Sequence, residues 1–245
     1  MPRVALAVPC YVSATRPGDA RHAETVLRAL GDDVTVLSGR CCGQPAFTSG
    51  FRPESQQVGM ELLRVAQPFD AIVMPSSSCV SMVQHYLPTM FEGRKRSGAE
   101  HIGARFHEFA SYVGGHSAIT LLSLRLQGTV AYHDACHARR ELRISEDVLG
   151  LLARIEGLEV RRLPFEAECC GFGGVFSVKQ PEVSAGMRQA KLADVAASGA
   201  QVLVSTDLSC LGHIEAGARG AGSALETWTL VELLSRALAG SQETV

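Results

Sequence analysis

Several features that would assign a sequence to a broad class of proteins are missing from this chain of 245 residues. It has no apolar run near the about 18 residues that a membrane-spanning helix needs, and its apolar N-terminal stretch is too short for the core of a secretion signal. The formal net charge is only −2 and the basic residues are not concentrated, which gives no reason to expect nucleic acid as a partner. A Gly-x-Gly-x-x-Gly nucleotide fingerprint is also absent. We therefore expect a cytoplasmic protein without a membrane span.

The cysteines, in contrast, follow one pattern twice, and none of the eight is left over. In each copy a single cysteine precedes a Cys-Cys-Gly tract and another single cysteine follows it. The first cysteine set is Cys10, Cys41, Cys42 and Cys79, and the second cysteine set is Cys136, Cys169, Cys170 and Cys210. The gaps before the doublets are 30 and 32 residues, and those after them are 36 and 39. This regularity predicts a chemical site that an internal duplication has built twice.

Hydrophobic patterning predicts strands that alternate with helices in both halves of the chain. The expected strands are Val4–Pro9, Asp33–Leu37, Ala71–Pro75, Gly128–His133, Leu158–Leu163 and Gln201–Ser205. The expected helices are Arg21–Leu30, Pro53–Gln67, Ser145–Ile155 with Ser145 as N-cap, Pro181–Ala197 and Leu225–Leu238. Such alternation is typical of an α/β fold, here two tandem pseudo-symmetric βαβ-type halves with mostly parallel sheets. We place the halves at residues 1–100 and 128–245, joined by a segment at 101–127 that contains a helix within Glu100–Leu126.

Each cysteine comes shortly after an expected strand, so the four thiols of a set should meet at the carboxyl edge of their sheet. Four thiolates suit a tetrahedral zinc ion or a [4Fe–4S] cluster. Adjacent cysteines cannot form the Cys-x2–4-Cys knuckle of structural zinc, whereas they can bind different irons of one cluster. The glycines Gly43, Gly171 and Gly173 would let the backbone approach the cofactor closely. Zinc in one half, disulfides including a vicinal one, and simple core packing stay open as alternatives.

Two tracts around the doublets extend the pattern beyond the cysteines. The tract Cys-Cys-Gly-Gln-Pro-Ala-Phe-Thr-Ser-Gly at 41–50 and the tract Cys-Cys-Gly-Phe-Gly-Gly-Val-Phe-Ser-Val-Lys at 169–179 resemble motifs of the cysteine-rich CCG-domain family. They are most similar to its lactate-utilization branch; other members are the B-type subunit of heterodisulfide reductases and the iron–sulfur subunit of glycolate oxidase. The resemblance covers essentially the whole chain.

The chain departs from the fullest form of the family motif, which ends in Cys-x-x-Cys and in heterodisulfide reductases holds a non-cubane cluster that acts on disulfides. Ser76 and Asp207 stand at the first of those two positions. The resemblance therefore implies an ordinary four-thiolate cluster in each half, with Asp207 as a conceivable fifth, oxygen ligand. Because these two cysteines are replaced, we do not expect the chain to react directly with disulfides as heterodisulfide reductases do.

The resemblance further implies an iron–sulfur electron-transfer subunit of a cytoplasmic complex that oxidises L-lactate to pyruvate. The ferredoxin run Cys-x2-Cys-x2-Cys-x3-Cys is absent, so a ferredoxin-like iron–sulfur subunit and a third small subunit would be its partners. Such a protein is an oxidoreductase only as part of the complex. A zinc-stabilised scaffold subunit, a thiol/disulfide oxidoreductase and a glycolate oxidase subunit are the alternatives.

Two histidines beside Cys136 are candidates for a catalytic role. His133 or His137 would protonate substrate or tune the cluster through a hydrogen bond to sulfur. The alternative is a polar strand end without chemistry. His213 after Cys210 is a further candidate of the same kind, and Lys179 and the pair Arg139 and Arg140 would bind a carboxylate substrate unless they are ordinary surface charges.

Overall fold

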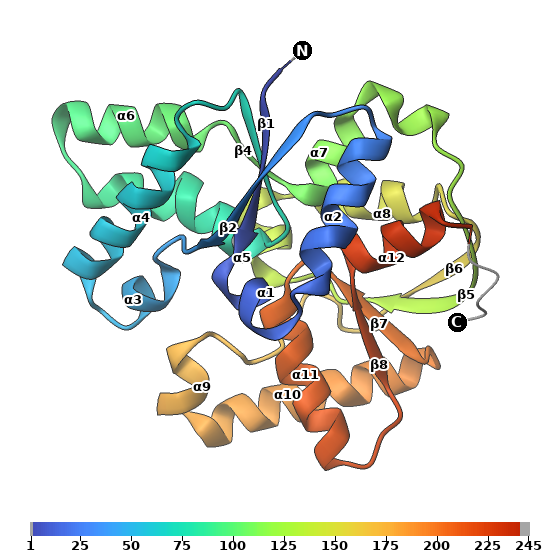
Figure 1. Cartoon of the computed structure of the whole chain (residues 1–245). Coiled ribbons are helices and arrows are strands. Elements are labelled where there is room, and N and C mark those ends of the chain that lie inside the picture. Colours follow the sequence, from blue (N-terminus) through green and yellow to red (C-terminus); the bar gives the residue numbers. More distant parts are fainter. Residues whose placement is uncertain (1, 241–245) are drawn as a thin grey trace.

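The computed structural model describes residues 2–240 as two four-stranded sheets in which every strand pair is parallel (Figure 1). The first sheet has the order β2-β1-β3-β4 and the second has the equivalent order β6-β5-β7-β8. The strands are β1 (Val4–Pro9), β2 (Val34–Arg40), β3 (Ala71–Met74), β4 (Phe106–Glu108), β5 (Arg125–Tyr132), β6 (Glu156–Arg162), β7 (Val202–Ser205) and β8 (Glu226–Thr229). The α/β fold with two similar halves, predicted from the sequence, is therefore confirmed.

Helices provide the crossovers that parallel strands need. Those of the first half are α1 (Cys10–Thr15), α2 (Gly18–Ala29), α3 (Gln44–Thr48), α4 (Arg52–Ala66), α5 (Ser77–Ser81), α6 (Gly93–Gly103) and α7 (Phe109–Gly115), with the π-helix η1 (Met82–Tyr86) and the 3₁₀ turn η2 (Pro88–Met90). Those of the second half are η3 (Ser117–Leu121), η4 (His137–Leu142), α8 (Ser145–Leu152), α9 (Val175–Lys179), α10 (Pro181–Ser198), α11 (Leu208–Gly220) and α12 (Leu230–Leu238). Among the described residues, no helix is both long and apolar enough to cross a bilayer.

The two halves share a hydrophobic core. All six residues of β1 are buried, and they alternate between the two faces of the first sheet. Leu6 and Val8 belong to a cluster that also contains Val130 and Leu203 of the second sheet, whereas Ala5 packs in a separate cluster on the other face. The last helix, α12, returns to pack against α2 of the first half (Figure 1). This packing and the shared cluster join the two halves.

Three local expectations were wrong. The segment Glu100–Leu126 contains the edge strand β4 and the short helix α7 in place of one joining helix, and the closing helix is preceded by β8, so that Trp228 lies on a strand. Both strands have only three or four residues, too few for an alternating pattern to stand out beside a helical one. Ser145 is the first residue of α8 and not its cap, because its hydroxyl donates instead to Asp134 at 2.7 Å.

Candidate functional site

The structure brings the four thiols of each set together at the carboxyl edge of a sheet. Cys10 begins α1 directly after β1, Cys41 and Cys42 lie in the loop after β2, and Cys79 lies in α5 after β3. The sulfurs form a chain of contacts from Cys10 to Cys41, from Cys41 to Cys42, and from Cys42 to Cys79. All of them are free thiols. The structure therefore shows four neighbouring free thiols in this set and no disulfide among them.

The second set repeats this arrangement after the equivalent strands. Cys136 lies just before η4, Cys169 and Cys170 follow β6, and Cys210 lies in the first turn of α11. Contacts run from Cys136 to Cys169, from Cys169 to Cys170, and from Cys170 to Cys210. The four thiols are again free.

The first cysteine of each doublet is set apart by its hydrogen bonds. Thiol groups of Cys10 and Cys42 donate to the sulfur of Cys41, and this lowers the pKa of Cys41 well below its usual range. The same bond, together with burial, raises the pKa of Cys10. In the second set, donation from Cys136 and Cys170 likewise lowers the pKa of Cys169. Hydrogen bonds from neighbouring thiols thus favour the thiolate form of the first doublet cysteine in each set, which is the form that binds a metal.

A glycine with left-handed backbone follows each doublet and lets the chain pass close to the next helix. Gly43 and Gly171 both have φ of 87°, and each backbone N–H lies 3.4 Å from the sulfur of the first doublet cysteine. A side chain would not fit: a Cβ at Gly43 would lie 2.8 Å from the Ser55 carbonyl oxygen, and one at Gly171 would lie 2.8 Å from that of Ser184. The doublet loop is therefore folded around its own sulfurs in both halves.

Two serines that the sequence analysis missed hold these loops. The hydroxyl of Ser55 donates to the Gly43 carbonyl at 3.0 Å, and that of Ser184 donates to the Gly171 carbonyl at 2.8 Å. They follow their glycines by 12 and 13 residues, so the repeat itself held the signal. Gly173 differs, because it turns the chain into α9 and a Cβ there would meet Phe176 at 2.9 Å.

The residues in place of the family's additional cysteines are helix caps. The Ser76 hydroxyl accepts from the backbone N–H of Cys79 at 3.4 Å. Asp207 is 2% exposed; its Oδ1 accepts from the backbone N–H of Ser209 at 3.2 Å and its Oδ2 accepts from that of Ser78 at 2.9 Å. Both carboxylate oxygens thus serve helix N-termini, which argues against Asp207 as an oxygen ligand.

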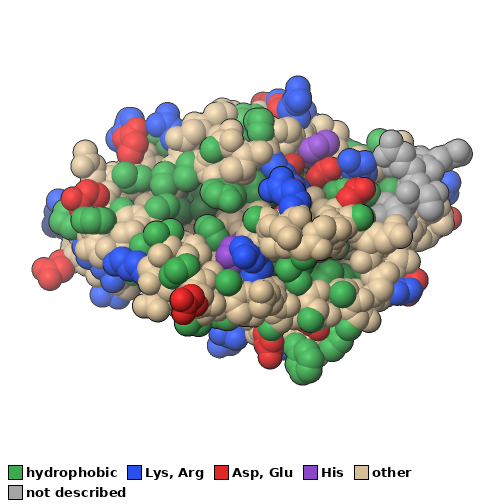
Figure 2. Space-filling view, turned by 90° about the horizontal axis from the view of Figure 1, so that it is seen from below, with side chains coloured by type: hydrophobic (Ala, Val, Ile, Leu, Met, Phe, Trp, Pro, Cys, Tyr) green, Lys and Arg blue, Asp and Glu red, His purple; other side chains and the backbone are tan. Residues whose placement is uncertain are grey.

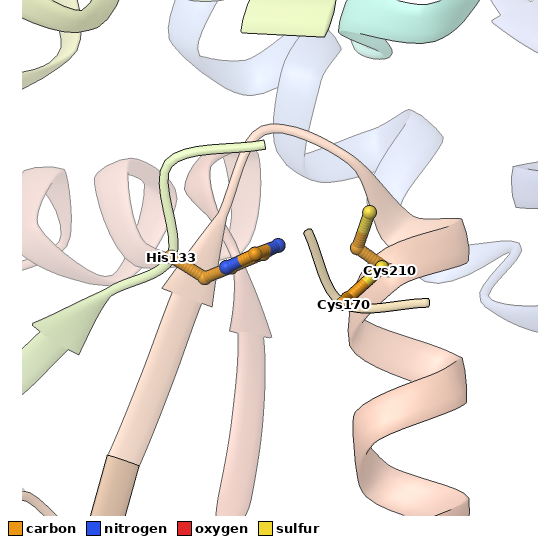
Figure 3. A group of neighbouring side chains, drawn as sticks. All are labelled: His133, Cys170 and Cys210. Atoms are coloured by element: carbon orange, nitrogen blue, oxygen red, sulfur yellow. The ribbon is translucent and has the colours of Figure 1, made fainter. Parts of the chain in front are cut away.

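His133 is the most unusual polar residue of the second half. It is fully buried, and neither ring nitrogen has a hydrogen-bond partner among the described residues. Burial lowers its pKa to about 4, so the ring is neutral. The ring points toward Cys170 and Cys210, and the three ligand atoms lie within 4.8 Å of one another (Figure 3). An orphaned imidazole beside two thiols is what a metal centre would satisfy.

The other candidate residues lie at different distances from the thiols. His137 places Nδ1 3.6 Å from the Cys136 sulfur and Nε2 3.4 Å from the amide nitrogen of Gln44, which follows the doublet of the first half. His213 contacts the loop serine Ser184 at 3.2 Å, and Arg139 is paired with Asp134 at 3.1 Å. Arg140 donates to the backbone carbonyl of Ala167 at 3.0 Å, while Lys179 lies at the end of α9. His133 and His137 are thus the candidates that lie against cysteine sulfurs.

The face of the molecule that carries α3 and α9 is rich in apolar side chains. Figure 2 shows this face from below, with hydrophobic side chains gathered over its left part. Phe51 after α3, Val178 in α9 and Val183 in α10 are 59%, 77% and 55% exposed. They lie in or next to α3 and α9, the helices that follow the two doublets.

Comparisons with known proteins agree with this picture. The family model described as "Cysteine-rich domain" (CCG) matches residues 4–84 and 130–215. Lactate utilization protein A 1 of Bacillus anthracis is 30% identical over 239 residues, which cover 96% of this chain and 99% of the relative. Lactate utilization protein A of an Exiguobacterium species is 34% identical over 240 residues, with 96% and 98% covered. The crystal structure of a hypothetical protein from Helicobacter pylori has a similar fold, with a TM-score of 0.64 and 10% identity over 99% of this chain and 50% of that one. The chain therefore belongs to the cysteine-rich CCG-domain family, to which its doublets, their glycines and their strand-end positions already pointed.

Proposed function

We propose that this protein is the iron–sulfur electron-transfer subunit of a cytoplasmic lactate-utilization system that oxidises L-lactate to pyruvate. The observation that carries the proposal is the pair of four-thiol sets, each at a sheet edge and each with adjacent cysteines. The names of the full-length relatives supply the metabolic role. The fold alone would serve glycolate or another 2-hydroxy acid equally well.

The donors of each set fit an iron–sulfur cluster. Cys42 and Cys170 are 2% and 1% exposed, so a centre bound there would be largely shielded from water. The backbone N–H groups of Gly43 and Gly171 point at sulfur, and such hydrogen bonds are one means by which proteins set cluster potentials. When bound, a [4Fe–4S] cluster would accept and release single electrons. The role of the chain is to hold the cluster, keep water out and orient its surroundings.

The partners that the family resemblance implies are a ferredoxin-like iron–sulfur subunit and a third small subunit, and the first would supply the clusters of the ferredoxin run that this chain lacks. The exposed apolar residues beside α3 and α9 support docking of a partner near the thiols, since apolar patches on a surface often mark contact sites. In this assignment the protein is an oxidoreductase only within its complex.

A zinc ion in the second half is a second candidate. The grouping of one histidine with Cys170 and Cys210 favours it, because a mixture of imidazole and thiolate ligands is common at structural zinc. A zinc-stabilised scaffold would have no part in electron transfer.

Metal analysis of protein purified without oxygen separates these assignments. We expect iron and acid-labile sulfide equivalent to one [4Fe–4S] cluster for each cysteine set, with the broad visible absorbance of iron–sulfur proteins. The matched variants Cys41→Ser and Cys169→Ser should each lose about half of the iron, since each alters one set. Colourless protein with stoichiometric zinc in both sets would refute the proposal.

A further inference from the structure

The strand register identifies which residue of the first half is equivalent to His133. Tyr132 in β5 pairs with Val204, and Leu6 in β1 pairs with Val73. Tyr132 lies four residues before Cys136, and Leu6 likewise lies four residues before Cys10. The residue after Leu6 is Ala7, so an alanine occupies in the first half the place that His133 occupies in the second.

This difference is confined to one buried side chain at otherwise equivalent sites. Ala7 and His133 are both 0% exposed, so neither position is accessible to a substrate dissolved in water. Ala7 has no polar side-chain atom, and its strand packs in the apolar core. His133 brings two ring nitrogens into the same location without a partner for either of them among the described residues.

A buried imidazole without a hydrogen-bond partner would be stabilised if one of its ring nitrogens bound a metal. A buried donor or acceptor that is left without a hydrogen bond destabilises the folded state. The backbone of His133 is nevertheless held firmly, because its N–H donates to the Val204 carbonyl at 2.8 Å and its carbonyl accepts from the Ser205 hydroxyl at 2.9 Å. The ring is directed from this anchored backbone at Cys170 and Cys210 (Figure 3). A metal centre held by those thiols would lie within reach of a ring nitrogen.

We propose that the imidazole of His133 is itself a ligand of the second centre. This inference rests on the proposed function, because it takes an iron–sulfur cluster as the occupant. The second centre then has a mixed set of thiolate and imidazole ligands, whereas the first centre has thiolates alone. The two centres are chemically distinct although the cysteine spacing is duplicated.

The test is a nitrogen hyperfine measurement on protein labelled with ¹⁵N-histidine and reduced so that its clusters are paramagnetic. A nitrogen bonded directly to iron gives a strong coupling, which we expect in the unaltered protein and in the variants His137→Ala and His213→Asn. The variant His133→Ala, which gives the second half the residue of the first, should lose that coupling and keep its cysteines. The control His213 lies in the same half, and its Nε2 lies 3.2 Å from the Ser184 hydroxyl.

The outcomes separate this inference from the proposed function. Clusters without any strong nitrogen coupling in the labelled, unaltered protein would overturn the histidine ligand and leave the electron-transfer assignment standing. A coupling that disappears in His137→Ala, and persists in His133→Ala, would also overturn it. Zinc in place of iron would refute the proposed function, and X-ray absorption at the zinc edge would then decide for or against a nitrogen ligand. If His133→Ala folds poorly, the assignment rests on the unaltered protein and the two other variants. A strong coupling that persists in both His137→Ala and His213→Asn would assign the nitrogen ligand to His133.

Discussion

Replacing Gly171 with alanine tests whether the doublet loop requires the close approach seen in the structure. At φ of 87° a non-glycine residue pays about 1–2 kcal/mol for the left-handed conformation. The new Cβ would also lie 2.7 Å from the Met187 Cβ and 2.8 Å from the Ser184 carbonyl oxygen, atoms that no side-chain rotation can move. Overpacking of this kind costs about 1–3 kcal/mol. Gly171→Ala should therefore lower the free energy of unfolding by about 2–5 kcal/mol.

The matched control is Gly222→Ala in the same half. Gly222 has φ of 69° and no atom within 4 Å of its ideal Cβ, so only the backbone cost of about 1–2 kcal/mol applies. Urea unfolding of the metal-free proteins, followed by the fluorescence of Trp228, measures both variants; this residue is the chain's only tryptophan and is 7% exposed. Equal losses in the two variants would refute the close-approach explanation. In the metal-loaded protein Gly171→Ala should also lose iron, because it displaces the N–H that contacts the Cys169 sulfur.

Three further predictions concern groups around the centres. Burial raises the pKa of Glu108 to about 8 from the usual 4.5, so the folded state keeps a proton that the unfolded state releases, and stability should fall as pH rises from about 4.5 to about 8. At about 1.4 kcal/mol per pKa unit, this fall in stability is at most about 5 kcal/mol. Glu108→Gln should remove most of it, and unfolding measured at pH 5 and at pH 9 shows whether it does. An unchanged pH profile in the variant would contradict the explanation. His137→Ala should slow lactate-dependent electron transfer in the reconstituted complex or shift the potential of the second centre, and unchanged values of both would discard a role for this ring. Asp207→Ala removes the cap of α11 and the acceptor for the Ser78 N–H, so thermal unfolding should show a loss of about 2–4 kcal/mol, whereas a loss below about 1 kcal/mol would show that water replaces these bonds.

The gathering of the thiols could be predicted because it follows from strand ends. Strand β1 has the expected bounds, and parallel strands place their carboxyl ends at one edge, so cysteines after β1, β2 and β3 had to meet. The edge strands β4 and β8 escaped prediction because Phe106–Glu108 and Glu226–Thr229 are too short to show a period of two and lie beside helical patterns.

The finer parts of the site depend on tertiary packing. That His133 would face Cys170 without a partner follows from the direction of a side chain at a strand end, which spacing does not give. The use of Asp207 as a cap for two helices likewise depends on the second half meeting the first. The serines Ser55 and Ser184 are different, because their similar offsets of 12 and 13 residues from the doublet glycines could have been read from the repeat.

The contact between the N-termini of α5 and α11 bears on the history of the duplication. The hydroxyl of Ser77 donates to that of Thr206 at 2.7 Å, and Asp207 accepts from the backbone of Ser78. If a half-length ancestor had formed a dimer with its own copy at this contact, both copies would have carried the same residue at the position that Ser76 and Asp207 now occupy. An aspartate at the position of Asp207 would then have stood twice near the symmetry axis, as two buried like charges. Fusion into one chain allows an acid on one side and the hydroxyl of Ser76 on the other. The joined gene could thus acquire an asymmetry that would have destabilised a symmetric dimer.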